Sequence, residues 1–372
     1  MGTGSRRVLI VESRAHVPSG HFAVRGAQLA EAYVDLGYRV ELLTSLGWAR
    51  EHEHPSPPFA VRRWRPWAQR LRRRTEQPWV ITLVEAIEIR ARVRRAASPP
   101  ELVVVLAWSE VPALLAALAP RRARWLVNHW GYPEGLPNSK LVDAVARWRE
   151  RRRQARGGMV RIVVSHERLR QLWDERVPFL DPVVAPIVGA REIEPNPDAR
   201  RVLGLPAGNL ALLFGDSRLK RRDVVLDAFA GLDRWTLVVG GPMANDLAPR
   251  PGLATFPGAV DDAVRDQLFA AVDLVVLSFS ADYPNESGTL MDAISAGTPV
   301  VCSDDARVAA IVLRHHLGPT FVGDDAESLA TAVRHAPASL APDALATARE
   351  EHSNRAVARG QLLVMGLRTP DA

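Results

Sequence analysis

The sequence predicts an α/β protein made of two Rossmann-like domains, each built on a parallel sheet. Short apolar runs that suit buried strands alternate with longer helical segments along most of the chain. Such alternation is typical of parallel strands joined by crossover helices. At 372 residues, the chain is long enough for two domains with a core each. One break interrupts the alternation, around 183–200, where turn-forming residues gather: Pro182, Pro186, Gly189, Pro195 and Pro197.

The elements follow one another in two series. Apolar runs predict the strands of the first half, at 8–12, 39–44, 102–106, 125–128 and 161–165, with a helix over 25–36. The second series has strands at 210–214, 237–241, 274–277 and 299–303, and a last helix over 344–366. We therefore expect a first domain over 1–185, a linker over 186–200, a second domain over 201–345 and a C-terminal helix over 346–372.

Composition excludes several classes of protein. A hydrophobic content of 47% with 24% charged residues is typical of a folded globular chain. The single cysteine, Cys302, excludes an internal disulfide and a cysteine-based metal site, and favours a reducing cytoplasm. The apolar run over 8–11 is too short for a signal peptide, and Ser109, Glu110 and Pro112 divide the longest apolar region. We expect a cytoplasmic protein.

The positive charge is concentrated in two clusters. The net charge is +6, and only Lys140 and Lys220 among the basic residues are lysines. Arginine and tryptophan alternate within 62–74 and again within 147–153. Such clusters suit an anionic membrane surface, where indoles lie at the headgroups and guanidinium groups bind phosphates. They would equally suit RNA, or form solvated helix faces with extended arginines.

The segment 285–301 is the most informative motif. It follows the apolar run 274–277 and opens with small and polar residues, so a strand leads into a helix N-terminus. Gly288 leaves the backbone accessible, and the free N–H groups of the first turn attract an anion. Gly297 and Pro299 end the helix before the next strand. Phosphate is the expected ligand.

This motif resembles the donor-site signature of the group 1 retaining glycosyltransferases. An ordinary strand–loop–helix of another doubly wound protein is the alternative. The resemblance implies two Rossmann-like domains facing across a cleft, the GT-B architecture, with the final helix crossing back to the first domain. Asp292 takes the place of the family's second glutamate, which holds the ribose, whereas the first glutamate falls on Pro284. Glu286 is a candidate substitute, and the backbone of Ser287, Gly288 and Thr289 is assigned to the diphosphate.

A second motif opens the second half. Residues 214–223 follow a strand and precede the apolar helix 224–229, similar to the glycine loop, arginine and lysine of the same family. Gly215 matches the glycine loop. By spacing, Arg218 matches the arginine and Arg221 the lysine, with Lys220 as the nearest alternative, because Arg222 stands where the family has glycine. Two cations would stabilise the departing diphosphate without a metal or cofactor.

Three further residues complete the predicted site. The resemblance places Val260, before the helix 261–271, against the nucleobase. Gly20 matches the glycine-containing first loop, which approaches donor and acceptor. His129 follows a strand at the edge where ligands bind, and either contacts the donor sugar, relays a proton from the acceptor, or has a structural role in its loop.

The sequence therefore predicts a metal-independent, retaining glycosyltransferase that moves a hexose-type sugar from a nucleoside diphosphate sugar to a hydroxyl-bearing acceptor. The acceptor is either lipid-linked, with an anionic membrane surface as partner, or a small molecule. No nucleic acid partner is expected. The alternative is an arginine-rich protein that binds RNA or a protein partner on an inactive glycosyltransferase scaffold, a hypothesis motivated by Pro284.

Overall fold

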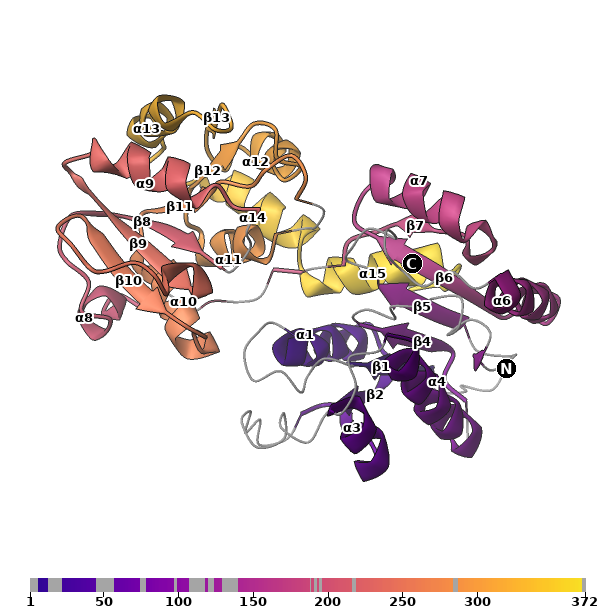
Figure 1. Cartoon of the computed structure of the whole chain (residues 1–372). Helices are drawn as coiled ribbons and strands as arrows, with labels where there is room; N and C mark the ends of the chain where they lie inside the picture. Colours follow the sequence, from indigo (N-terminus) through magenta and orange to yellow (C-terminus); the bar gives the residue numbers. More distant parts are fainter. Residues whose placement is uncertain are drawn as a thin grey trace. The chain divides into compact units, whose positions relative to one another are not determined.

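A computed structural model gives the fold (Figure 1). The structure describes residues 6–12, 22–44, 57–73, 78–96, 99–106, 118–119, 124–128, 140–187, 189–190, 193, 196–215, 219–283 and 287–369. The chain forms two compact units. The first comprises Met1–Ile187 and Asn354–Ala372, and the second comprises Val188–Ser353.

The first unit is built on a seven-stranded parallel sheet in the order β3-β2-β1-β4-β5-β6-β7. Its central strands are almost wholly apolar and buried, as expected of parallel strands covered on both faces. The edge strand β3 is polar and largely exposed. The strands are β1 (Arg7–Val11), β2 (Arg39–Thr44), β3 (Ala60–Arg63), β4 (Leu102–Val105), β5 (Arg124–Asn128), β6 (Met159–Val164) and β7 (Val183–Val184).

Helices cover both faces of this sheet. Alternate residues of the strands, such as Leu9 and Val103, pack under α3 (Pro66–Arg73), α4 (Pro78–Arg95), α6 (Lys140–Gln154) and α7 (Glu167–Arg176). The intervening residues, such as Val8 and Val104, pack under α1 (Phe22–Asp35) and α15 (Asn354–Val364). A short 3-10 turn, η1 (Pro178–Leu180), follows α7.

The second unit repeats the plan with six parallel strands in the order β10-β9-β8-β11-β12-β13. Its core joins β8 and β9 to α9 and α13. The strands are β8 (Asn209–Phe214), β9 (Trp235–Gly241), β10 (Leu253–Pro257), β11 (Leu274–Leu277), β12 (Val300–Ser303) and β13 (Thr320–Phe321). The helices are α8 (Ala199–Val202), α9 (Arg222–Ala230), η2 (Pro242–Ala244), α10 (Asp262–Ala271), α11 (Gly288–Ala296), α12 (Ala309–Arg314), α13 (Ala326–Arg334) and α14 (Pro342–Glu351).

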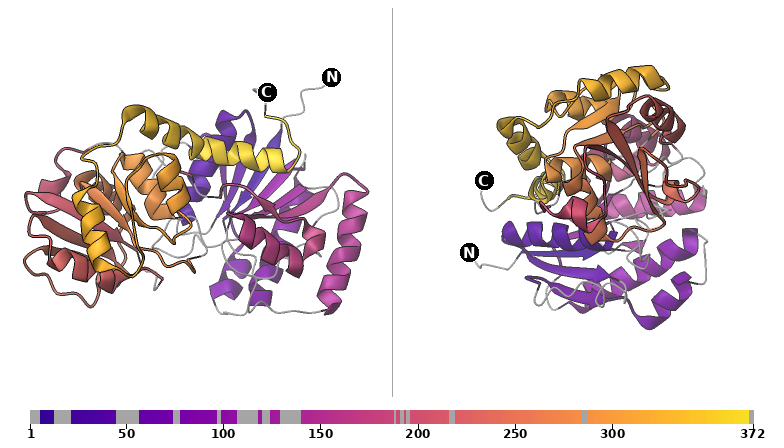
Figure 2. Two further views of the ribbon diagram at one scale, coloured as in Figure 1. Left: turned by 90° about the horizontal axis from the view of Figure 1, so that it is seen from above. Right: turned by 90° about the vertical axis from the view of Figure 1, so that its left-hand side faces the viewer.

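The last segment differs from the single helix predicted over 344–366. It consists of α14, in the second unit, and α15, in the first, with the break at His352 and Ser353. α15 packs along α1, as both views show (Figure 2). The Tyr33 hydroxyl donates a 2.9 Å hydrogen bond to Gln361 Oε1, and both side chains are buried. The C-terminal segment is therefore part of the first unit's core.

None of the helices within the described ranges is long and apolar enough to cross a membrane.

Candidate functional site

The candidate site lies at the carboxyl ends of β8 and β11 in the second unit. These strands are neighbours, and the chain leaves β8 toward β9 but β11 toward β12 on the opposite side. Such a reversal of strand order is where open α/β sheets bind ligands. β8 leads into Gly215, and β11 leads into the loop before α11. The two predicted motifs therefore meet at one edge of the sheet.

The start of α11 has the geometry of an anion site. Ser287 is the N-cap, and its Oγ accepts a 3.1 Å hydrogen bond from Leu290 N. Gly288 and Thr289 form the first turn, where backbone N–H groups and the helix dipole favour negative charge. Gly297, with φ of 76°, ends the helix as an αL cap. Local sequence thus places a helix N-terminus, which favours an anion, at the edge of the sheet.

Lys220 projects toward this helix end. Its Nζ donates to the Phe214 carbonyl, lies 3.4 Å from Thr289 Oγ1 and sits 5.0 Å from the centre of the Phe279 ring. Gly215 adopts φ of 129°, and a Cβ there would lie 2.8 Å from Lys220 Nζ. The close approach therefore requires glycine. The structure brings Gly215, Lys220 and Thr289 together, with a buried ammonium group among them.

Arg221 has different partners, the carboxylates of Asp305 and Asp324. Its guanidinium bonds Asp305 bidentately at 2.8 and 2.5 Å, bonds Asp324 at 2.7 Å, and donates to the Phe279 carbonyl at 2.5 Å. The hydrogen bonds with Asp305 raise the pKa of Arg221, and the same contact lowers the pKa of Asp305. Of the two adjacent cations, Lys220 points to α11, whereas Arg221 ties the loops after β11, β12 and β13 together.

A cavity of about 770 Å³ opens beside these cations. Arg222 lies on its wall and bonds Asp246 at 2.5 Å and the Met243 carbonyl at 3.0 Å. The hydrogen bond with Asp246 raises the pKa of Arg222. The remaining lining comes from the start of α9, the segment after β9 and Asp324: Lys220, Arg221, Asp223, Val224, Pro242, Met243, Asn245, Asp246 and Asp324.

Asp292, which the resemblance assigns to the ribose, is buried in α11 and forms an ion pair with Arg265 of α10. Arg265 is itself buried, and its guanidinium carbon lies 5.8 Å from the centre of the Phe214 ring. A second carboxylate, Asp262, lies 3.7 Å from Arg265. Arg265 therefore fixes the orientation of Asp292 at the same edge of the sheet.

Val260 lies in the loop between β10 and α10, partly exposed. The following residue, Asp261, caps α10 through a 2.8 Å hydrogen bond to Val264 N. Gly258 N donates to Asn245 Oδ1 at 2.7 Å, which joins this loop to the segment after β9. The loop before α10 is thus attached to the wall of the 770 Å³ cavity.

Four predicted site residues lie outside the described part of the chain: Gly20, His129, Arg218 and Glu286. In the first unit, buried polar side chains gather at the corresponding edge of the sheet, where strands end. They are Glu12 after β1, Thr44 at the end of β2 and Asn128 at the end of β5. Within the described ranges, neither atom of the buried Asn128 amide has a hydrogen-bond partner. This polar edge directly precedes the position of His129.

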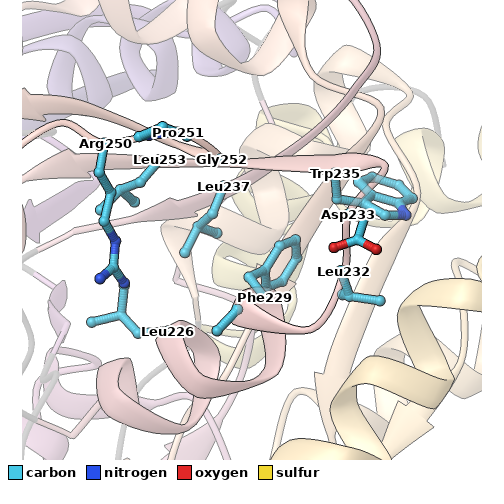
Figure 3. Close-up of a pocket in the computed structure, with 11 residues that line it drawn as sticks. Leu226, Phe229, Leu232, Asp233, Trp235, Leu237, Arg250, Pro251, Gly252 and Leu253 are labelled. Carbon is cyan, nitrogen blue, oxygen red and sulfur yellow. The ribbon is translucent and has the colours of Figure 1, made fainter.

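A second cavity of the second unit lies at the opposite end of the sheet (Figure 3). Its volume is about 440 Å³, and its walls include Trp235 and Leu253, the first residues of β9 and β10. Side chains from α9, among them Leu226 and Phe229, close one side. Ligands of open α/β sheets bind at carboxyl ends, so this cavity is not the candidate catalytic site.

Sequence reasoning missed the carboxylates and the arginine that orient the predicted residues. Asp305 follows β12 at the carboxyl edge, a position that the topology marks as ligand-facing. Asp324 has φ of 61°, and its pairing with Arg221 joins residues 103 apart in the chain. Arg265 falls within an amphipathic helix pattern, where its contact with Asp292 leaves no local signal.

Comparison with known proteins identifies the class. Residues 209–337 match the family model "Glycosyl transferases group 1", and these residues contain both motifs of the candidate site. The second unit is therefore a group 1 glycosyltransferase domain, and the chain has the two-sheet GT-B fold. This confirms the resemblance predicted from the two motifs.

Solved structures share the fold along the whole chain. Sucrose-phosphate synthase from Thermosynechococcus elongatus is 16% identical with a TM-score of 0.64, covering 97% of both chains. A glycosyltransferase from Rickettsia africae is 14% identical with a TM-score of 0.70, covering 97% of this chain and 98% of that one. Anabaena HepE, solved with UDP-glucose, is 15% identical with a TM-score of 0.64, covering 97% and 99%. A search of curated protein sequences found no match.

Proposed function

We propose that this protein is a retaining, metal-independent glycosyltransferase that transfers a hexose-type sugar from a nucleoside diphosphate sugar to a hydroxyl group. One observation carries the proposal. The Lys220 ammonium group lies beside Gly215 and the first turn of α11, at the switch point of a group 1 glycosyltransferase domain. A cation and a helix N-terminus directed at one place suit a diphosphate.

The proposed chemistry follows from charge development. Breaking the bond between sugar and diphosphate builds negative charge on the leaving oxygen, and preorganised positive groups lower that barrier. Lys220 and the N–H groups of Gly288 and Thr289 supply this charge in the proposal, joined by Arg218. Asp292, held by Arg265, takes the ribose, and Val260 faces the base. HepE binds UDP-glucose, which supports a uridine donor for this chain.

The acceptor is assigned to the first unit. Glu12, Thr44 and Asn128 offer hydrogen-bonding groups at the carboxyl edge of its sheet, and Gly20 and His129 follow β1 and β5. Sugar and acceptor hydroxyls need such partners because buried polar groups are stable only when hydrogen-bonded. A lipid-linked acceptor and a small molecule both fit this description.

Incubation with a panel of sugar nucleotides tests the proposal. The full-length protein should release free sugar and nucleoside diphosphate slowly from one donor, without an acceptor and in the presence of EDTA. Proton NMR of an acceptor product should show the anomeric configuration of the donor. Arg234→Gln, an exposed residue outside the site, serves as the matched control.

Absence of turnover with every sugar nucleotide, combined with unchanged thermal stability in UDP and GDP, would contradict the proposal. It would favour the inactive scaffold instead. Loss of activity only in EDTA would overturn metal independence alone.

A further inference from the structure

The surface of α6 combines exposed apolar side chains with exposed basic side chains. Leu141, Val145 and Trp148 are 74%, 41% and 48% exposed. They are spaced by four and three residues, so they lie on one side of the helix. The opposite side of α6, through Ala146, Glu150 and Arg153, is buried. Figure 1 shows α6 on the outside of the first unit.

Cations flank this apolar stripe. Lys140, Arg147, Arg151 and Arg152 are exposed on α6. The Arg152 guanidinium carbon lies 4.2 Å from the centre of the Trp148 ring, so charge and indole form one surface. Long arginine side chains can keep their charge at a polar boundary while their methylene groups contact apolar material.

The acidic residues of α6 do not offset these cations. Asp143 bonds Arg176 of α7 at 3.2 Å, and the buried Glu150 pairs with Arg153. Each carboxylate thus has a cationic partner on the protein side of the helix. The exposed side of α6 carries only apolar, amide and basic groups, an arrangement that complements an anionic surface.

A small cavity of about 290 Å³ lies beside α6. Arg147 and Arg151 line it beside Phe179, whose ring centre lies 5.6 Å from the Arg147 guanidinium carbon. Two carboxylates, Glu150 and Asp181, also line it, and they pair with Arg153 and with Arg161 respectively. Its positive charge therefore comes from arginines adjacent to the apolar stripe.

We propose that α6 docks this protein on an anionic phospholipid bilayer. Leu141, Val145 and Trp148 enter the interface between headgroups and acyl chains, while Arg147, Arg151 and Arg152 bind lipid phosphates. Lipid is favoured over RNA because Leu141 and Val145 have no ring on which a base could stack. The surface requires no property of the proposed catalytic site, so vesicle binding and sugar turnover can fail independently.

The first Arg/Trp cluster, predicted over 62–74, is less available for this role. Trp64 is buried and donates from its indole to the Glu12 carbonyl. Arg65 pairs with Glu88 at 3.2 Å, and Arg62 with Glu41 at 3.8 Å. Trp67 and Leu71 of α3 remain exposed at 41% each, which makes them the natural comparison for α6.

Co-sedimentation with vesicles tests the proposal. The full-length protein should pellet with phosphatidylglycerol/phosphatidylcholine vesicles, much less with phosphatidylcholine alone, and less at high salt because screening weakens the attraction. Leu141→Ser/Trp148→Ser should reduce binding at least tenfold while circular dichroism and thermal unfolding stay unchanged. Arg147→Gln/Arg151→Gln/Arg152→Gln should remove the preference for anionic lipid. Leu313→Ser, at a 55% exposed leucine of α12, should bind like the parent protein.

Four results would overturn the proposal. The first is equal pelleting with and without phosphatidylglycerol, and the second is undiminished binding by the folded α6 variants. The third is loss of binding in Trp67→Ser/Leu71→Ser alone, which would assign docking to α3. Binding of single-stranded oligouridylate without vesicle binding would make RNA the partner and refute the lipid surface.

Discussion

Two adjacent cations, Lys220 and Arg221, have different environments. Lys220 lies among Gly215, Phe279 and Thr289, and Arg221 lies among the carboxylates of Asp305 and Asp324. Sequence spacing assigns the family's lysine to Arg221, but the direction of the side chains favours Lys220 for the diphosphate. A side chain surrounded by carboxylates is already neutralised and has less to offer an anion.

This difference predicts that substitution of Lys220 chiefly affects the donor, whereas substitution of Arg221 chiefly affects stability. Lys220→Met should weaken donor binding or slow transfer by about 10- to 100-fold, because a charge-assisted contact contributes about 1.5–3 kcal/mol. Arg221→Met should chiefly lower stability, by about 1–3 kcal/mol, because its bonds join three loops. Donor turnover and thermal unfolding of both variants measure this. A larger loss of turnover in a stably folded Arg221→Met would show that the spacing, rather than the geometry, identifies the cation.

The sequence was sufficient to predict where the candidate site lies, but not which side chains contact one another within it. Ser287, Gly288 and Thr289 lie at a helix start because cap and glycine signals are local. The pairing of Asp292 with Arg265 joins residues 27 apart on different helices, and it depends on how α10 packs on α11. Burial and charge pairing of this kind are tertiary properties, so the motif alone does not reveal them.

Among the strands, too, some could be predicted from the sequence and others could not. The strands at 39–44 and 274–277 agree residue for residue with their predictions. Residues 274–277 are a continuous apolar run, which marks a buried parallel strand, and 39–44 contain the apolar residues Val40, Leu42 and Leu43. The edge strands β3, β7, β10 and β13 were not predicted. They are two to five residues long, β3 ends in two arginines, and β10 ends in a proline, so neither length nor apolar pattern distinguishes them from loops.

The last helix offers a test at this scale. Leu362 of α15 is fully buried in the first unit's core, whereas the adjacent Leu363 is 76% exposed. Leu362→Ala should lower the free energy of unfolding by about 2–5 kcal/mol, since it removes buried methyl groups and leaves a cavity. Leu363→Ala should change it by less than about 0.5 kcal/mol. Urea unfolding compares them, and equal effects would show that α15 does not pack on α1 as described.

A histidine pair joins α12 to α14. The rings of His315 and His352 lie 5.3 Å apart between centres, and Glu351 Oε2 lies 3.5 Å from His315 Nε2. Burial lowers the pKa of both histidines, and the neighbouring Arg314 acts in the same direction, whereas Glu351 opposes it. Both rings are therefore expected to be neutral in the folded state at pH 7.

This arrangement predicts a loss of stability in acid. Because the folded-state pKa lies below the unfolded value of 6.5, the unfolded state binds more protons between these two values. The contribution of the two neutral histidines to stability is fully present above pH 6.5, and it is lost as the pH falls from 6.5 to the folded-state pKa. Urea unfolding at pH 7.5 and 5.5 should show a smaller decrease for His315→Gln/His352→Gln than for the parent protein. Exposed His335→Gln is the control, and an identical decrease in all three proteins would refute the role of the pair.

At the scale of the whole molecule, the two units have different roles in the proposed function. The second carries the group 1 glycosyltransferase match and the cationic edge, and the first carries buried polar strand ends and the α6 surface. The fold shared with solved glycosyltransferase structures covers 97% of the chain. Of the steps of the proposed reaction, donor binding is therefore the one with the most direct structural support.

Calorimetric titration of the full-length protein with UDP and GDP tests that claim. The account predicts saturable binding of one nucleotide per chain to the second unit, weakened about 10- to 100-fold in Lys220→Met and unchanged in the control Arg234→Gln. Failure of both nucleotides to bind the folded parent protein, or equal binding by Lys220→Met, would contradict it.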